Sequence, residues 1–258
     1  MKHNIKTVLI LVALFLMAQY IGLLIINNSD ILPYDLDRPV FSEQFGFLQL
    51  FGYVIVASVF ALLIAFLSFE VVWRIIFFIS VFFCLTIAFG AFMPDNLAAL
   101  LAFLFAVAKI FRLSLWVHNF GELFIYGGLA AIFVPAITLG GAALLLILIS
   151  VYDAIAVWKT KHMIKLAKFQ TKVNLFTGLL VPSAKNKVAM LGGGDIGFPL
   201  IFIGAAYLAI GAKALIIPIF TSIALYLLLY YGDKGKFYPA MPFISAGVFA
   251  GYLVTLLI

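Results

Sequence analysis

Long apolar runs are the feature that most constrains how this chain can fold. Nine stretches consist mainly of hydrophobic side chains, and each has about the length that an α-helix needs to cross a bilayer, roughly 17–25 residues. They lie at 7–26, 46–69, 72–92, 96–113, 120–138, 139–158, 190–210, 213–231 and 239–257. Of 258 residues, 66% are hydrophobic and only 10% are charged, whereas soluble domains carry about 25% charged residues. The sequence therefore predicts an all-α polytopic membrane protein with nine transmembrane helices.

Two of these spans need a separate argument. The region 120–158 lacks a polar loop and is too long for one helix, but Pro135 and the pair Gly140-Gly141 offer a turn that divides it. The N-terminus resembles a secretion signal because a basic start precedes an apolar run. That run is about 20 residues long and no small-residue cleavage site follows it, so we expect a retained first span.

The basic residues predict the orientation, because cytoplasmic loops are enriched in lysine and arginine. With the N-terminus inside, 14 of the 16 basic residues fall on the inner side. These are Lys2, Lys6, Arg74, Lys109, Arg112, Lys159, Lys161, Lys165, Lys168, Lys172, Lys185, Lys187, Lys234 and Lys236. Only Arg38 and Lys213 fall outside, whereas an eight-span chain would put the basic loop 159–187 on the same side as the acidic loop 27–45. We therefore expect a cytoplasmic N-terminus and an extracytoplasmic C-terminus.

The chain divides into three parts by this scheme. Residues 1–158 hold helices one to six, residues 159–188 form a basic cytoplasmic loop, and residues 189–258 hold the last three helices. The loop begins as a basic helical continuation and ends as an irregular stretch, and its seven lysines favour contact with anionic lipid headgroups. The net charge of +6 has the same topological explanation, so no nucleic-acid partner is expected.

Two aspartates, Asp153 and Asp195, lie well within predicted spans, while the other acids, Glu122 among them, lie in loops or at span ends. A carboxylate at the centre of a membrane helix costs on the order of 2.5–3.5 kcal/mol, which makes it a candidate functional group. Measured from Lys159 and Lys187 at the inner surface, helical rise places the two acids at depths of about 9 and 12 Å. Because the two helices are consecutive and antiparallel, we expect the carboxylates to face each other.

Such a pair can perform acid–base chemistry. Two acids in one low-dielectric site cannot both ionise cheaply, so they hold a single proton. The ionised acid can take a proton from water while the protonated acid hydrogen-bonds a peptide carbonyl, as in aspartic proteases. Gly192, Gly193 and Gly194 would leave room beside Asp195 for water and substrate, although glycines also serve as packing sites in membranes. The same carboxylates could instead couple ions in a transporter or leak channel.

The motifs around these aspartates resemble those of a known family. "VYDAIAV" around Asp153 and "GGGDIGFP" around Asp195 are similar to the Tyr-Asp and Gly-x-Gly-Asp motifs of the presenilin and signal peptide peptidase family of intramembrane aspartyl proteases. That family carries the two motifs on the sixth and seventh of nine spans. Its third motif, Pro-Ala-Leu at the start of the ninth span, corresponds here to Pro239-Ala240-Met241, with methionine in place of leucine. The short inner loop makes the chain most similar to the compact archaeal members.

The resemblance implies a role for each of these residues. Asp153 and Asp195 would form the catalytic dyad, with Tyr152 lining the site beside the first. The glycines at 192–194 would shape the approach to Asp195, and the segment 239–241 would pack against the dyad and position an unwound substrate strand. The implied substrates are transmembrane helices of other proteins, with no cofactor and no obligatory partner subunit. The implied location is a multi-pass position in a membrane, the cell membrane if the source is prokaryotic or archaeal.

Other chemistries have weaker support in the sequence. His3, His118 and His162 form no His-Glu-x-x-His pattern, so no metal site is expected. A prepilin-type peptidase also carries Gly-x-Gly-Asp, but a lysine usually follows that motif closely, and residues 196–198 here are Ile-Gly-Phe. The prepilin-type peptidase and the ion-coupled transporter remain as alternatives to the presenilin-like protease.

Overall fold

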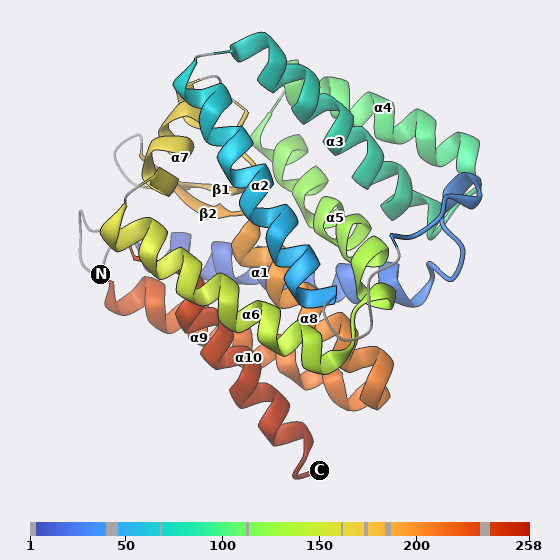
Figure 1. Cartoon of the computed structure of the whole chain (residues 1–258), viewed down its shortest axis with the longest axis vertical. Helices are drawn as coiled ribbons and strands as arrows, with labels where there is room; N and C mark the ends of the chain where they lie inside the picture. Colours follow the sequence, from blue (N-terminus) through green and yellow to red (C-terminus); the bar gives the residue numbers. More distant parts are fainter. Residues whose placement is uncertain are drawn as a thin grey trace.

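The computed structural model describes residues 4–39, 46–67, 69–111, 114–160, 162–172, 175–183, 187–232 and 238–258. In these ranges the chain forms ten α-helices and one antiparallel hairpin (Figure 1). The helices are α1 Ile5–Asn27, α2 Gly46–Phe66, α3 Glu70–Gly90, α4 Asp95–Phe111, α5 Leu115–Phe133, α6 Leu139–Ala154, α7 His162–Lys172, α8 Gly194–Ile210, α9 Ile217–Tyr231 and α10 Met241–Thr255. Nine of them coincide with the predicted apolar runs, and α7 is the predicted basic continuation, so the mostly helical membrane fold is confirmed.

Six helical segments among the described residues are long and apolar enough to cross a membrane. They are Ile5–Asn27, Gly46–Phe66, Glu70–Gly90, Leu115–Ala136, Leu139–Lys159 and Gly194–Tyr231. The last of these joins α8 and α9 through the short 3₁₀ helix Gly211–Ile216, while α4 and α10 have only 17 and 15 residues. The number of crossings and the orientation of the chain stay predictions.

The predicted turn between the fifth and sixth spans is confirmed at Pro135. A short 3₁₀ helix, Val134–Ala136, follows α5 there. The hydroxyl of Thr138 then accepts the backbone N–H of Gly141 at 3.1 Å, which satisfies one of the free donors at the start of α6. Gly140 and Gly141 accordingly lie in the first turn of α6 rather than in the loop.

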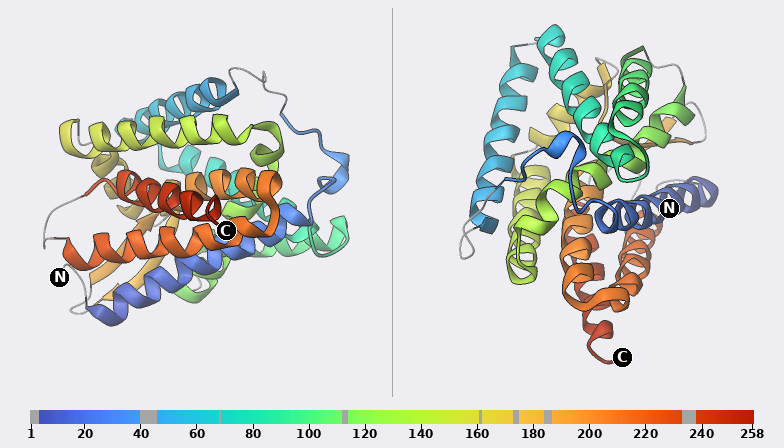
Figure 2. Two further views of the ribbon diagram at one scale, coloured as in Figure 1. Left: turned by 90° about the horizontal axis from the view of Figure 1, so that it is seen from below. Right: turned by 90° about the vertical axis from the view of Figure 1, so that its right-hand side faces the viewer.

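Helix α8 lies at the centre of the helix packing, where it contacts α1, α5, α6, α9 and α10. Its side chains from Ile196 to Ala206 are buried on nearly all faces apart from Phe198, as expected for a helix that is apolar all round. A Cβ on Gly204 would lie 2.7 Å from Ile26 of α1, so this glycine permits close approach of the two helices. The buried amide of Gln19 donates to the carbonyl of Ile196 at 3.1 Å, which ties α1 to the same helix. Figure 2 shows α1 running alongside α9, and the two are in contact.

The segment before α8 differs from the prediction. Residues 177–187 were expected to be irregular, but β1 (Gly178–Ser183) pairs with β2 (Lys187–Gly192), with Gly178 opposite Gly192. The helix therefore begins at Gly194 rather than near residue 190, and the depth of Asp195 derived from helical rise is wrong, because a strand rises about 3.3 Å per residue. The hairpin packs against α1 and α5, with Leu179 and Val181 buried.

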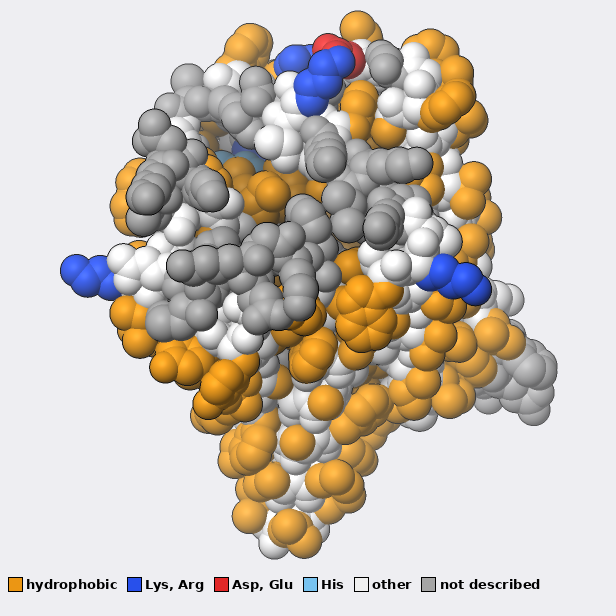
Figure 3. All heavy atoms as spheres, turned by 90° about the vertical axis from the view of Figure 1, so that its left-hand side faces the viewer, with side chains coloured by type: hydrophobic (Ala, Val, Ile, Leu, Met, Phe, Trp, Pro, Cys, Tyr) orange, Lys and Arg blue, Asp and Glu red, His pale blue; other side chains and the backbone are white. Residues whose placement is uncertain are grey.

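One face of the molecule separates charge from apolar surface. In Figure 3 the visible charged side chains lie at the top and at mid-height, and hydrophobic side chains cover most of the surface below them. Large apolar side chains such as Phe66 and Trp116 are more than four-fifths exposed. Such a surface suits contact with lipid rather than water.

Candidate active site

Asp153 lies in the last turn of α6. Directly after this helix the chain forms a π-helical turn, Ile155–Lys159, a feature that occurs frequently at functional sites. Tyr152 and Asp153 are both half-buried. One turn earlier, the hydroxyl groups of Ser150 and Ser245 lie 2.7 Å apart and connect α6 to α10. The carboxylate of Asp153 is thus presented toward the start of α10.

Asp195 is the second residue of α8, and a single residue, Gly193, separates this helix from the hairpin. The residues Gly192–Gly194 form the strand-to-helix junction between β2 and α8. The backbone N–H of Gly193 donates to the carbonyl of Thr177 at 3.1 Å, and this hydrogen bond joins the junction to the residue before β1. Gly192 still pairs with Gly178 across the hairpin. The direction of the Asp195 side chain is therefore fixed by the end of β2 as much as by the helix.

The third motif contacts Asp153 through its main chain. The backbone N–H of Met241 donates to Oδ2 of Asp153 at 3.1 Å, and the backbone of Ala240 also hydrogen-bonds this carboxylate. Pro239 and Met241 are buried, and Met241 belongs to the main hydrophobic core. Because the hydrogen bonds use backbone donors, they do not require leucine at position 241.

The two aspartates meet at one cavity. Its volume is about 300 Å³, and both carboxylates line it. The cavity is also lined by Val157, Leu166, Ala167, Gln170, Phe176, Thr177, Met190, Gly192, Gly193, Gly194, Tyr238 and Ala240. The structure thus brings together the two aspartates, the three glycines and Ala240, whereas Tyr152, Pro239 and Met241 lie outside this lining.

The three glycines of the motif have different surroundings, and so they have different structural roles. A Cβ on Gly192 would lie 3.3 Å from Oδ2 of Asp195, so this glycine leaves space directly beside the carboxylate. A Cβ on Gly193 would lie 2.7 Å from the Tyr126 hydroxyl, which makes that glycine a close packing site against α5. Gly194 is exposed, and a Cβ there would meet only Phe198 at 3.4 Å.

A buried ion pair was missed by the sequence reasoning. Glu122 was assigned to the end of a span and Lys109 was counted on the inner side, but the two residues are only 1% and 3% exposed. Lys109 Nζ lies 2.5 Å from Glu122 Oε1. Glu122 is the eighth residue of α5 (Leu115–Phe133), so it stands inside the helix rather than at its start. A lysine and a glutamate 13 positions apart on different helices carry no recognisable spacing signal.

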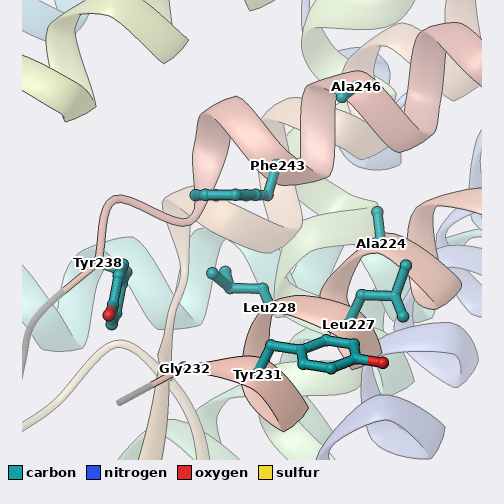
Figure 4. A pocket seen from close by; sticks show the side chains of 8 residues that line it. All are labelled: Ala224, Leu227, Leu228, Tyr231, Gly232, Tyr238, Phe243 and Ala246. Carbon is teal, nitrogen blue, oxygen red and sulfur yellow. The ribbon is translucent and has the colours of Figure 1, made fainter.

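A second hollow lies between α9 and α10 (Figure 4), with a volume of about 410 Å³. Its lining consists of Ala224, Leu227, Leu228, Tyr231, Gly232, Tyr238, Phe243 and Ala246. None of these is acidic or basic, so this apolar groove offers no group for hydrolysis. Tyr238 lines both the groove and the cavity that holds the aspartates.

Among the described residues, no group of three or more histidine, cysteine, aspartate or glutamate side chains could hold a metal ion. His118 instead has its Nε2 2.8 Å from the carbonyl oxygen of Gly178. The chemistry that this site can carry therefore rests on its two carboxylates.

Comparison with known proteins gives the class and then the family. Two solved structures of a presenilin family intramembrane aspartate protease share this fold at 23% sequence identity. The one in space group C222 has a TM-score of 0.68 and covers 97% of this chain and 98% of its own. The one in space group P2 has a TM-score of 0.66 and covers 96% of each chain. No curated protein matches the chain.

Fold and cavity together describe a helical membrane protein of the intramembrane aspartic protease class. Residues 12–258 match the profile of the family described as "Signal-peptide peptidase, presenilin aspartyl protease". This match spans nearly the whole sequence, so the chain belongs to the signal-peptide peptidase and presenilin family of aspartyl proteases.

Proposed function

We propose that this chain hydrolyses peptide bonds within transmembrane helices of other proteins, with Asp153 and Asp195 as its catalytic pair. The observation that carries the proposal is that the two carboxylates, from α6 and α8, line one cavity in a helical membrane fold. The family match supports this reading. It gives no support to a prepilin-type peptidase or to an ion-coupled transporter.

In the proposed mechanism the pair holds one proton. The ionised carboxylate takes a proton from a water molecule, whose oxygen attacks the carbonyl carbon of the scissile bond, while the other carboxyl donates its proton to the carbonyl oxygen. The resulting tetrahedral diol then collapses as a proton passes to the amide nitrogen and the C–N bond breaks. The products are a carboxylic acid and an amine. The backbone N–H of Met241 would hold Asp153 in its orientation throughout.

An unwound substrate suits the proposed chemistry, because the scissile carbonyl must be free to reach both carboxylates of the cavity. A helical peptide hides its carbonyl groups in its own hydrogen bonds. The substrate would therefore enter the cavity as a short extended strand. Gly192 would leave space beside Asp195 for this strand or for the attacking water.

The proposed arrangement in the membrane has nine spans, with the N-terminus on the cytoplasmic side and the C-terminus outside. Its support is the agreement of nine helices with nine apolar runs together with the inner-side bias of lysine and arginine. Lipid would surround the exposed apolar side chains. The membrane would be the cell membrane if the source is prokaryotic or archaeal, and the chain would act without an obligatory partner subunit.

The test uses the purified full chain and a reporter protein with one transmembrane helix. The wild type should cut the reporter, whereas D153N and D195N should abolish cleavage, because the amide preserves the shape of each side chain but cannot share a proton. D30N, which changes an exposed loop acid, is the matched control and should cleave normally. Cleavage retained in either dyad variant would contradict the assignment. Activity that appears only when a second protein is added would contradict the absence of an obligatory partner.

A further inference from the structure

The buried carboxylate of Glu122 binds three donors from three different segments. Its Oε1 accepts Lys109 Nζ of α4 at 2.5 Å. Its Oε2 accepts the backbone N–H of Gly178 in β1 at 3.0 Å and also the hydroxyl of Tyr126, one turn further along α5. This network of Lys109, Glu122, Tyr126 and Gly178 lies outside the cavity lining, and the proposed mechanism does not use it.

Both partners of Oε2 contact the residues that lead into Asp195. Gly178 lies opposite Gly192 in the hairpin. The hydroxyl of Tyr126 packs against Gly193, where a Cβ would lie only 2.7 Å away. Oε2 of Glu122 therefore binds both Gly178 and Tyr126, the two residues that contact the strand-to-helix junction.

A gain in stability does not by itself explain why the protein buries the ion pair of Lys109 and Glu122. Removing two charges from water is costly, and replacing a buried ion pair by apolar side chains is often neutral or stabilising. Neighbouring side chains of α5 already fasten the hairpin, since Asn119 donates to the carbonyl of Leu180 at 2.7 Å and accepts its N–H at 3.0 Å. Glu122 additionally restrains the junction itself, because Tyr126 contacts Gly193, two residues before Asp195.

We infer that Glu122 is a positioning residue for Asp195. It acts through Gly178 and Tyr126, and Lys109 holds the carboxylate in place. Glu122 touches neither substrate nor the reacting atoms. Its loss would let the segment Gly192–Gly194 shift, so the carboxylate of Asp195 would spend less time in its productive orientation, because small displacements of reacting groups lower rates steeply. This inference rests on the proposed catalytic role of Asp195.

The test begins with E122Q. An amide has one acceptor oxygen and one donor group, whereas Glu122 faces three donors, so the NH₂ group must oppose either Lys109 or the Gly178 and Tyr126 donors. We expect kcat to fall by about tenfold or more while KM changes by less than about threefold, since substrate contacts are intact. In the double variant K109Q/E122Q, the amide oxygen of residue 122 can serve Gly178 and Tyr126 while its NH₂ group donates to the new amide at 109. The double variant should recover most of the lost kcat.

Glu70 offers a matched control. It forms an exposed ion pair with Lys172 at 3.5 Å, and E70Q makes the same acid-to-amide change at a residue that does not line the cavity. E70Q should leave kcat and KM unchanged, because exposed pairs contribute little. All rates are taken per folded enzyme, with the folded fraction measured by size-exclusion chromatography and thermal unfolding. A merely structural role would change the folded fraction and leave kcat per folded enzyme intact.

The outcomes separate this inference from the proposed function. An inactive wild type, or cleavage by D195N, would remove the proposed function on which it rests. An active wild type with inactive D195N and with kcat of E122Q within about twofold of wild type would overturn the positioning role. If E122Q does not fold, Y126F decides, because it removes only one hydroxyl and keeps the ring against Gly193. We expect Y126F to lower kcat by about threefold or more at unchanged KM, and an unchanged kcat would overturn the inference.

Discussion

Replacing Gly193 by alanine adds one methyl group at the tightest point of the junction. The backbone of Gly193 has φ −63° and ψ −32°, which alanine adopts without strain. The cost is therefore steric. The new Cβ would lie 2.7 Å from the Tyr126 hydroxyl and 2.9 Å from Cε1 of the same ring, well inside the 3.5–4.0 Å of an ordinary contact.

Tyr126 cannot easily move away. Its hydroxyl donates to Glu122, and the side chain is only 5% exposed and packs within the main hydrophobic core. Overpacking of this kind typically costs about 1–3 kcal/mol. Glycine is preferred over alanine at the N-cap position that Gly193 occupies, so the backbone offers no compensating gain. We therefore expect G193A to lower the free energy of unfolding by about 1–3 kcal/mol.

The assay is reversible unfolding in mixed micelles, followed by circular dichroism, with G194A as the control. A Cβ on Gly194 meets only Phe198, at 3.4 Å, and the residue begins a helix, so G194A should be neutral or slightly stabilising. Both variants change a glycine to alanine at adjacent positions, and only the alanine at 193 would collide with Tyr126. A G193A protein as stable as G194A would refute the packing argument.

Three further predictions concern the same region. G192A should lower kcat several-fold with little loss of stability, because its Cβ would lie 3.3 Å from Oδ2 of Asp195; steady-state kinetics on folded enzyme checks this, and an unchanged kcat would argue against the space having a role. N119A should lower the free energy of unfolding by about 2–4 kcal/mol, because it leaves the buried N–H and C=O of Leu180 without hydrogen-bond partners. Amide hydrogen exchange of β1 should become faster, and unaltered protection would contradict the prediction. M241L, which restores the leucine of the family motif, should leave cleavage within about twofold of wild type, since Asp153 is bound by the backbone N–H and the swap nearly conserves volume; a large change in rate would show that the side chain matters.

The helices were predictable because apolar length is a local property of the sequence. The turn at Pro135 was also predictable, since proline ends a helix whatever surrounds it. The approach of Asp153 to Asp195 followed from their places on consecutive helices, and both line one cavity. Both residues lie at one cavity even though the depth argument for Asp195 assumed a helix where the chain forms β2.

The hairpin and the ion pair were not predictable, because they depend on distant partners. The strand Gly178–Ser183 is a short apolar run beside a lysine-rich segment, and its hydrogen bonds come from residues 187–192 and from α5. Lys109 resembled the other basic residues that mark the inner side, and only the fold shows that Glu122 lies beside it. Side-chain identity alone does not distinguish a charge at the membrane surface from one buried between helices.

The long-range contacts of α1 have a consequence for how the protein is made. Gln19 donates its amide to Ile196, 177 residues further along the chain, and the Tyr20 hydroxyl donates to the carbonyl of Leu215, 195 residues away. Ribosomes add about 5–20 residues per second, so Ile196 is synthesised roughly 9–35 s after Gln19. During that interval the first helix sits in the bilayer with a polar amide whose native acceptor has yet to be synthesised. The helix that begins with the Asp195 motif thus completes the surroundings of the earliest-made helix, and nascent chains that stop short of it leave the Gln19 amide without its native acceptor.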